Sequence, residues 1–135
     1  AGLENADAYQ TPILVASSSH PDITRSKWVS QLVFDDQAQA TVAALFAIDE
    51  LLIDRAVIFE DPDDPHSSFL AREFARKFKE AGGVAELLVF NNDNDKSAEK
   101  FDQLKERDFG FLYLPVYTTK LIKIVKKIRT INWNP

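Results

Sequence analysis

Short apolar runs alternate along the chain with longer segments whose apolar residues repeat every three or four positions. Such short runs are typical of strands buried in a sheet, and the longer repeats are typical of amphipathic helices. The predicted strands are residues 12–16, 28–34 (a strand or an extended crossing), 56–59, 84–90 and 109–114. The predicted helices are residues 35–52, 64–81, 96–107 and 118–131, with residues 1–10 either a short helix or a disordered arm. The alternation predicts an α/β fold: a doubly wound, mostly parallel sheet with helices on both faces.

Residues 55–83 form the clearest strand–loop–helix unit. After the apolar run comes an acidic loop, in which Asp64 is placed to cap a helix and Pro65 to occupy its first position. Glycines at residues 82–83 are expected to end that helix. Its predicted inward face consists of Leu70, Ala71, Phe74, Ala75, Phe78 and Ala81. Because parallel sheets bind ligands at the carboxyl ends of their strands, functional side chains are expected in the loops that follow the strands.

Two other helices also have a predicted inward face. The helix at residues 35–52 is rich in alanine and apolar around much of its girth, which indicates cover on more than one side. Its buried residues are predicted to be Val42, Leu45, Phe46, Ile48 and Leu52. For the last helix they are predicted to be Leu121, Ile124, Val125, Ile128 and Ile131.

The composition narrows the class of protein. A chain of 135 residues with 45% hydrophobic residues and 10 Phe is enough for one domain with a real core. The net charge of −5 argues against a protein that binds nucleic acid through phosphate contacts. Without cysteine, thiolate metal sites, disulfides and cysteine nucleophiles are excluded. The sequence has no run of 18 apolar residues of the kind that spans a membrane. Neither an initiator Met nor a signal peptide stands at Ala1, so we expect a chain that is processed or cut from a longer one.

Four predicted loops follow strands and carry polar side chains. They cover residues 17–20, 60–66, 91–95 and 116–119 and supply hydroxyls, amides, carboxylates, one His and one Tyr. Such a set suits hydrogen bonding to a small polar ligand. Tyr117 is the aromatic residue expected to be functional, whereas Phe111 and Tyr113 are expected to pack in the sheet.

The sequence supports metal binding and catalysis less well than it supports the binding of a small polar ligand. The acidic loop at residues 60–64 is able to hold Mg²⁺ in principle, but no glycine-rich phosphate loop accompanies it, and a solvated loop with a helix cap is favoured. The stretch at 91–95 lacks the Gly and Glu of a calcium loop and is interpreted as a plain turn. Ser17, Ser19 and His20 lack the glycines of a nucleophile elbow. We therefore predict no catalytic residue, no metal site and no cofactor.

The last helix carries a cluster of cations, Lys120, Lys123, Lys126, Lys127 and Arg129. A basic amphipathic helix is found at membrane surfaces and on nucleic acids. A solvated face is the favoured interpretation, because the rest of the chain is acidic and cations suit a helix C-terminus.

Four segments, in this order, resemble the extracytoplasmic receptors for branched-chain amino acids that serve ABC transporters. The first is residues 12–24, PILVASSSHPDIT, and the second is residues 34–39, FDDQAQ. The third combines RAVIFED at 55–61 with LAREF at 70–74 and FKEAGG at 78–83, and the fourth is FGFLYLPVYTTK at 109–120. The resemblance implies the type I periplasmic-binding fold, in which two α/β lobes close on a small polar ligand, and it implies binding without catalysis.

The resemblance also implies site residues. Ser17 and Ser19 match the loop that grips the amino and carboxylate ends of the ligand, and Tyr117 matches an aromatic residue that lines the cleft. His66 stands where the family usually has a ligand-stacking Tyr, and Ser67 and Val116 replace two usual glycines. These departures change the ring contact, so the resemblance does not fix the ligand beyond the amino-acid-like class.

By the same resemblance, residues 1–24 correspond to the end of a first lobe with its ligand loop, and residues 25–135 to a second, unfinished lobe. The implied location is the periplasm or the cell exterior. The implied partner is an ABC permease, and exposed apolar edges favour pairing with a second copy of the chain. One rival is the ligand-sensing domain of a membrane receptor or regulator. Another is a flavodoxin- or receiver-like protein that uses Asp61, Asp63 or Asp64 with Mg²⁺.

Overall fold

The computed structural model of the chain describes residues 2–89 and 109–130. The chain divides into two compact units, Ala1–Gln39 and Ala40–Pro135. This division after Gln39 is based on the compactness of the two units. The boundary predicted after residue 24 is based on the family resemblance, and the assignment of residues 1–24 to a first lobe stays a prediction. The turn predicted at residues 91–95 and the helix predicted at 96–107 lie outside the described residues.

The first unit contains a two-stranded parallel sheet. Its elements are α1 (Gly2–Tyr9), β1 (Ile13–Val15), the 3₁₀ helix η1 (Pro21–Arg25) and β2 (Val29–Gln31). The Ser26 hydroxyl donates a hydrogen bond of 2.7 Å to the Asp7 carboxylate and thereby joins the segment before β2 to α1. The strand predicted at residues 12–16 is present as β1, but its predicted burial is wrong, since Leu14 is exposed and its neighbours are half-buried. Within the described residues, β1 pairs with β2 alone.

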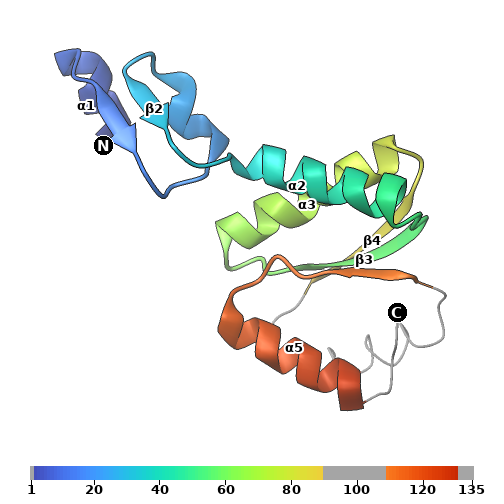
Figure 1. The fold of residues 1–135 in the computed structure, drawn as a ribbon. Helices are drawn as coiled ribbons and strands as arrows, with labels where there is room; N and C mark the ends of the chain where they lie inside the picture. Colours follow the sequence, from blue (N-terminus) through green and yellow to red (C-terminus); the bar gives the residue numbers. More distant parts are fainter. Residues whose placement is uncertain (1, 90–108, 131–135) are drawn as a thin grey trace. The chain divides into compact units, whose positions relative to one another are not determined.

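The second unit contains a three-stranded parallel sheet in the order β4-β3-β5. Its elements are α2 (Asp36–Leu45, which begins in the first unit), the π-helical turn η2 (Phe46–Glu50), β3 (Arg55–Glu60), α3 (Pro65–Glu80), β4 (Val84–Val89), β5 (Phe111–Tyr113) and α5 (Thr118–Thr130). Helices α2 and α3 cover one face of the sheet and α5 covers the other (Figure 1). The predicted doubly wound, mostly parallel α/β fold is confirmed.

The central strand β3 is covered on both faces, as its apolar run predicts. Ala56 and Ile58 belong to the cluster under α2 and α3, while Val57 and Phe59 belong to the cluster under α5. These four side chains are at most 2% exposed. Because successive residues of a strand point to opposite faces, a strand buried on both sides needs an unbroken apolar run.

The inward face of α3 also agrees with the sequence. Leu70, Ala71, Phe74, Ala75 and Phe78 are buried, whereas Ala81 is exposed because it forms the helix C-cap. In α5 the buried residues are Ile124 and Ile128, with Leu121 and Val125 half-buried. Ile131 lies outside the described residues.

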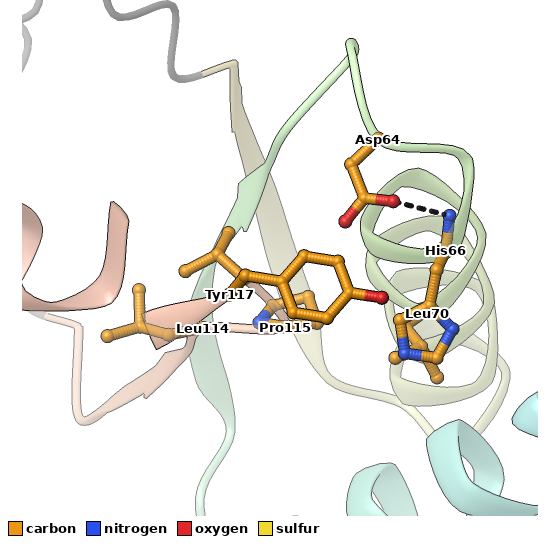
Figure 2. A pocket seen from close by; sticks show the side chains of 7 residues that line it. Asp64, His66, Leu70, Leu114, Pro115 and Tyr117 are labelled. Atoms are coloured by element: carbon orange, nitrogen blue, oxygen red, sulfur yellow. Dashed lines mark hydrogen bonds between the residues drawn. The ribbon is translucent and has the colours of Figure 1, made fainter. Parts of the chain in front are cut away.

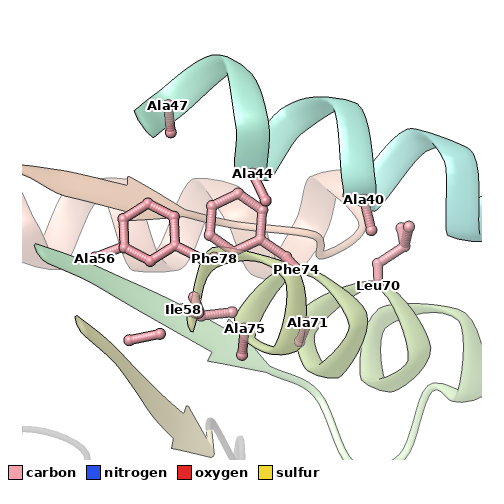
Figure 3. Packing of buried hydrophobic residues seen from close by; sticks show 11 residues of the cluster. Ala40, Ala44, Ala47, Ala56, Ile58, Leu70, Ala71, Phe74, Ala75 and Phe78 are labelled. Carbon is pink, nitrogen blue, oxygen red and sulfur yellow. The ribbon is translucent and has the colours of Figure 1, made fainter. Parts of the chain in front are cut away.

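The predicted inward face of α2 is largely wrong. Ala40, Ala44 and Ala47 face α3 and are fully buried (Figure 3). Small side chains let α2 approach α3, whose phenylalanines fill the space between the helices. Of the five residues predicted to be buried, Ile48 is half-buried, and the exposed ones are Val42, Leu45, Phe46 and Leu52. The helix also ends earlier than predicted, because a π-helical turn follows Leu45 and Leu52 adopts a left-handed backbone with φ of 56°.

The start of α3 offers a direct test of helix capping. The Asp64 carboxylate accepts a hydrogen bond of 3.1 Å from the His66 backbone N–H, and Pro65 occupies the first helical position. Asp64→Ala is expected to lower the free energy of unfolding by about 1 kcal/mol, because it leaves that N–H without its side-chain acceptor. Urea denaturation followed by circular dichroism measures the change. Asp63→Ala, at an exposed neighbour, is the control, and an equal loss in both variants would contradict the capping role.

Candidate functional site

The carboxyl ends of β3 and β5 lie side by side, because the two strands pair in parallel with Ile58 opposite Tyr113. The loop after β3 leads into α3, where His66 is the second residue of the helix. The loop after β5 leads into α5, and Tyr117 directly precedes that helix. Strand pairing therefore brings His66 and Tyr117, which are far apart in the sequence, to the same edge of the sheet.

His66 and Tyr117 meet at the rim of a small hollow (Figure 2). Their ring centroids are 6.1 Å apart and their planes are inclined by 28°. The hollow has a volume of about 180 Å³, and besides these two rings it is lined by Asp64, Leu70, Leu114, Pro115 and Val116. It is thus mainly apolar, with one imidazole, one phenol and one carboxylate. Complete ligand sites typically enclose about 300–1,000 Å³, so this hollow suits part of a small solute.

The acidic loop beside the site is solvated only in part, at Pro62 and Asp63, whereas Glu60 and Asp61 are buried. The Glu60 carboxylate is buried and accepts hydrogen bonds from Arg72 Nε at 2.8 Å and from the Ser68 hydroxyl at 3.0 Å. The Asp61 carboxylate is also buried and forms an ion pair with Lys120 of α5. Buried carboxylates of this kind require a compensating cation and hydrogen bonds. The helix-cap part of the prediction is confirmed by Asp64.

The geometry gives no support to a Mg²⁺ site in this loop. The carboxylates of Glu60 and Asp61 already bind cationic side chains, which compete with a metal ion. Within residues 2–89 and 109–130, no three His, Asp or Glu side chains are grouped so that they could hold a metal ion.

Ser17 and Ser19 lie in the first unit, in the loop after β1. Ser17 is exposed and Ser19 is half-buried. The Ser19 carbonyl accepts a hydrogen bond of 2.8 Å from the Asp36 backbone N–H, and the His20 Nδ1 accepts one of 3.2 Å from the Asp22 backbone N–H. The second unit brings together His66 and Tyr117, and the participation of Ser17 and Ser19 in the same site stays a prediction.

Sequence reasoning missed the role of Lys120. It was grouped with the cations of a solvated helix face, yet its side chain is only 19% exposed, and it pairs with Asp61. The position of Lys120 in the predicted helix was an indication of this pairing. A cation in the first turn of a helix is disfavoured by the helix dipole, and a nearby carboxylate offsets that cost. The neighbouring cations Lys123, Lys126 and Arg129 are exposed, as expected. None of the described helices has the length and apolar character needed to cross a membrane.

Phe111 and Tyr113 lie in strand β5 of the sheet, as predicted, and they also pack against α3. Their rings stack on Phe74, with centroid distances of 6.1 Å and 4.1 Å. These aromatic contacts fix β5 against α3 and so define the position from which the Tyr117 loop starts.

Comparison with protein-family models and with curated proteins gives no match. Among solved structures, the chain is similar to the leucine-binding protein LivK from Thermotoga maritima, with 23% identity and a TM-score of 0.81. It is also similar to an ABC transporter substrate-binding protein from Desulfitobacterium hafniense in complex with Leu, with 15% identity and a TM-score of 0.79. A third is the branched-chain amino acid transporter substrate-binding protein LivJ from Streptococcus pneumoniae in complex with isoleucine, with 20% identity and a TM-score of 0.73.

These matches cover 98% of this chain, but only 38%, 40% and 38% of the respective solved chains. The chain therefore spans about two fifths of the length of the proteins that it resembles. At this level of identity the likeness shows a shared fold, which is that of part of a type I periplasmic binding protein. The fold implied by the resemblance in the sequence motifs is confirmed by these structures.

Proposed function

We propose that the chain is part of an extracytoplasmic receptor of an ABC transporter, and that it binds an amino-acid-like solute without catalysis. The observation that carries the proposal is the meeting of the His66 and Tyr117 rings over an apolar hollow at the carboxyl edge of the sheet. Ligands of open parallel sheets bind at that edge. Two of the solved structures that the chain resembles hold Leu and isoleucine, which supports a solute of this class.

Each group of the site has a defined task in this proposal. The apolar residues Leu70, Leu114 and Val116 provide contact for an aliphatic part of the solute. The rings of His66 and Tyr117 form a wall that offers both ring faces and hydrogen-bonding groups. Ser17 and Ser19 are proposed to bind the charged ends of the solute when the receptor closes around it. The periplasm or the cell exterior is the proposed location, and an ABC permease is the proposed partner of the closed form.

A titration of the isotope-labelled 135-residue chain tests the proposal. Single amino acids and small carboxylates are added one at a time, and NMR shifts of the side chains around the hollow are followed. Because the chain spans about two fifths of the length of such receptors, we expect weak binding. The expected Kd is on the order of 1 mM, which corresponds to a binding free energy of about −4 kcal/mol. The shifts are expected at His66, Leu70 and the 114–117 loop.

Matched variants assign the response to the two rings. His66→Ala and Tyr117→Ala are expected to abolish the shifts, because each removes one half of the wall. Tyr9→Ala replaces a tyrosine of the first unit at an exposed position, and it is expected to leave the shifts unchanged. Shifts that persist in both site variants, or that lie away from the hollow, would contradict the proposed site.

A further inference from the structure

We propose that the Asp61–Lys120 ion pair positions the ligand wall, in that it holds the Tyr117 loop against the start of α3 so that the His66 and Tyr117 rings meet. The inference rests on the proposed function, since it assigns to Lys120 the placement of one of the proposed binding residues. Lys120 is a positioning residue in this scheme and does not itself line the hollow.

Asp61 is fixed on the α3 side of the site. One oxygen of its carboxylate accepts a hydrogen bond of 3.2 Å from the Asp63 backbone N–H. The Asp61 backbone N–H donates to the buried Ser67 hydroxyl at 3.2 Å, and the Asp61 carbonyl accepts from the Ser68 hydroxyl at 3.0 Å. Its side chain is only 4% exposed. Asp61 therefore moves with the first turn of α3, which carries His66.

Lys120 is fixed on the Tyr117 side. Its backbone N–H donates a hydrogen bond of 3.0 Å to the Tyr117 carbonyl, and the Leu121 N–H donates to the same carbonyl at 2.9 Å. Tyr117 and Lys120 thus belong to one helical turn. When the Lys120 ammonium binds the Asp61 carboxylate, that turn is tied to α3 through a charge-assisted hydrogen bond.

Packing against the core under α5 holds Leu114 and Val116 of the loop that carries Tyr117, and the ion pair is an additional tie beside the ring. Between Tyr113 at the end of β5 and Thr118 at the start of α5, the Val116 N–H donates to the Leu114 carbonyl at 2.8 Å, which is a local bond within the loop. The Tyr117 side chain is 64% exposed, so burial contributes little to its placement. The ion pair lies one helical turn from this ring and has a buried carboxylate, so solvent screening weakens it less than a surface pair.

The helix dipole strengthens the argument that this lysine has a specific task. Lys120 is the third residue of α5, where the positive end of the dipole disfavours a cation. The Asp61 carboxylate offsets this cost and at the same time gives the positive end of α5 a negative neighbour. The exposed cations of α5, which are Lys123, Lys126 and Arg129, lie further along the helix.

The test compares Lys120→Met with Lys120→Arg and with Lys123→Met in the 135-residue chain. In the ligand-free chain, the nuclear Overhauser contact between the His66 and Tyr117 rings reports their placement. Lys120→Met is expected to lose this contact, because it removes the ammonium and keeps the aliphatic stem. Lys120→Arg retains the charge and Lys123→Met alters an exposed lysine, and both are expected to preserve the contact.

Binding of L-leucine, measured by NMR titration, is the second readout. If the freed loop occupies the binding position about one tenth of the time, the affinity for L-leucine falls about tenfold in Lys120→Met. Should Lys120→Met not fold, the double variant Asp61→Asn with Lys120→Met carries the test, since it leaves no buried charge unpaired. This variant is expected to fold and to lack the ring contact.

The outcomes separate the two proposals. Loss of the ring contact in Lys120→Met supports the positioning role. If the unaltered chain also fails to bind L-leucine, that result counts against leucine as a ligand of the proposed function. Retention of both the ring contact and the affinity in Lys120→Met, or in the double variant, overturns the positioning role while leaving the proposed function standing.

Discussion

Replacing Phe74 with alanine is expected to lower the free energy of unfolding by about 3–5 kcal/mol, the range for large buried side chains whose loss leaves a cavity. Phe74 has no solvent exposure and belongs to the core between α2, α3 and the sheet. Its ring stacks on Tyr113 at 4.1 Å, on Phe78 at 5.5 Å and on Phe111 at 6.1 Å between centroids. Removal of this ring therefore affects one helix and one strand together. Urea denaturation with a fixed m-value measures the loss.

Phe46 provides the control for this effect. It is a phenylalanine of the same unit, but its side chain is 53% exposed. Phe46→Ala is expected to change the free energy of unfolding by no more than about 0.5 kcal/mol, as is usual for surface substitutions. A loss for Phe46→Ala that equals the loss for Phe74→Ala would show that the assigned inward faces of α2 and α3 are not those of the folded chain. A Phe74→Ala variant as stable as the unaltered chain would contradict the same assignment.

The structure of β3 and α3 was predictable because local signals agree there. The apolar run of β3 requires cover on both faces, Asp64 and Pro65 mark the start of α3, and glycines mark its end. Propensity, periodicity and capping all indicate the same structure there, and the tertiary contacts of the folded chain agree with these local signals.

The face of α2 was not predictable from its sequence. The helix is apolar around most of its circumference, so its large side chains and its alanines are equally compatible with burial by pattern. Which face is inward depends on the partner helix, and α3 presents the bulky Phe74 and Phe78, against which small residues fit. Whether small or large side chains fit between two helices depends on the side-chain volumes of both helices. The hydrophobic pattern of one helix alone does not give this information.

The site was predictable only in part for a similar reason. His66 and Tyr117 were selected because each follows a strand end, and parallel pairing of β3 with β5 brings such positions together. The ion pair between Asp61 and Lys120 joins residues of two different loops, and neither residue has a local pattern that names its partner. The dipole cost of Lys120 signals that a partner exists but does not identify it.

Gly83→Ala is expected to be the most damaging of the glycine substitutions in the described chain, with a loss of about 1–3 kcal/mol, the usual range for overpacking. The backbone N–H groups of Gly82 and Gly83 donate to the carbonyls of Lys79 and Phe78 at 3.0 and 2.9 Å, the bonding pattern that closes a helix in a Schellman motif. A Cβ built on Gly83 lies 2.2 Å from Cε1 and 2.5 Å from Cδ1 of Phe78. Because Phe78 is fully buried, its ring can move only against the side chains of the surrounding core.

Two other glycines and a double variant isolate this clash. Gly82→Ala is expected to cost about 1–2 kcal/mol for a different reason, since its φ of 96° is unfavourable for any residue with a Cβ although nothing lies within 4 Å. Gly110→Ala, whose Cβ would make an ordinary contact of 3.4 Å with Ile53, is expected to change stability by less than about 0.5 kcal/mol. In a Phe78→Leu background, the cost of Gly83→Ala is expected to fall by about 1 kcal/mol while that of Gly82→Ala stays the same, a coupling measured by a double-mutant cycle. Strict additivity of Gly83→Ala and Phe78→Leu would mean that the ring of Phe78 is not what makes glycine necessary at residue 83.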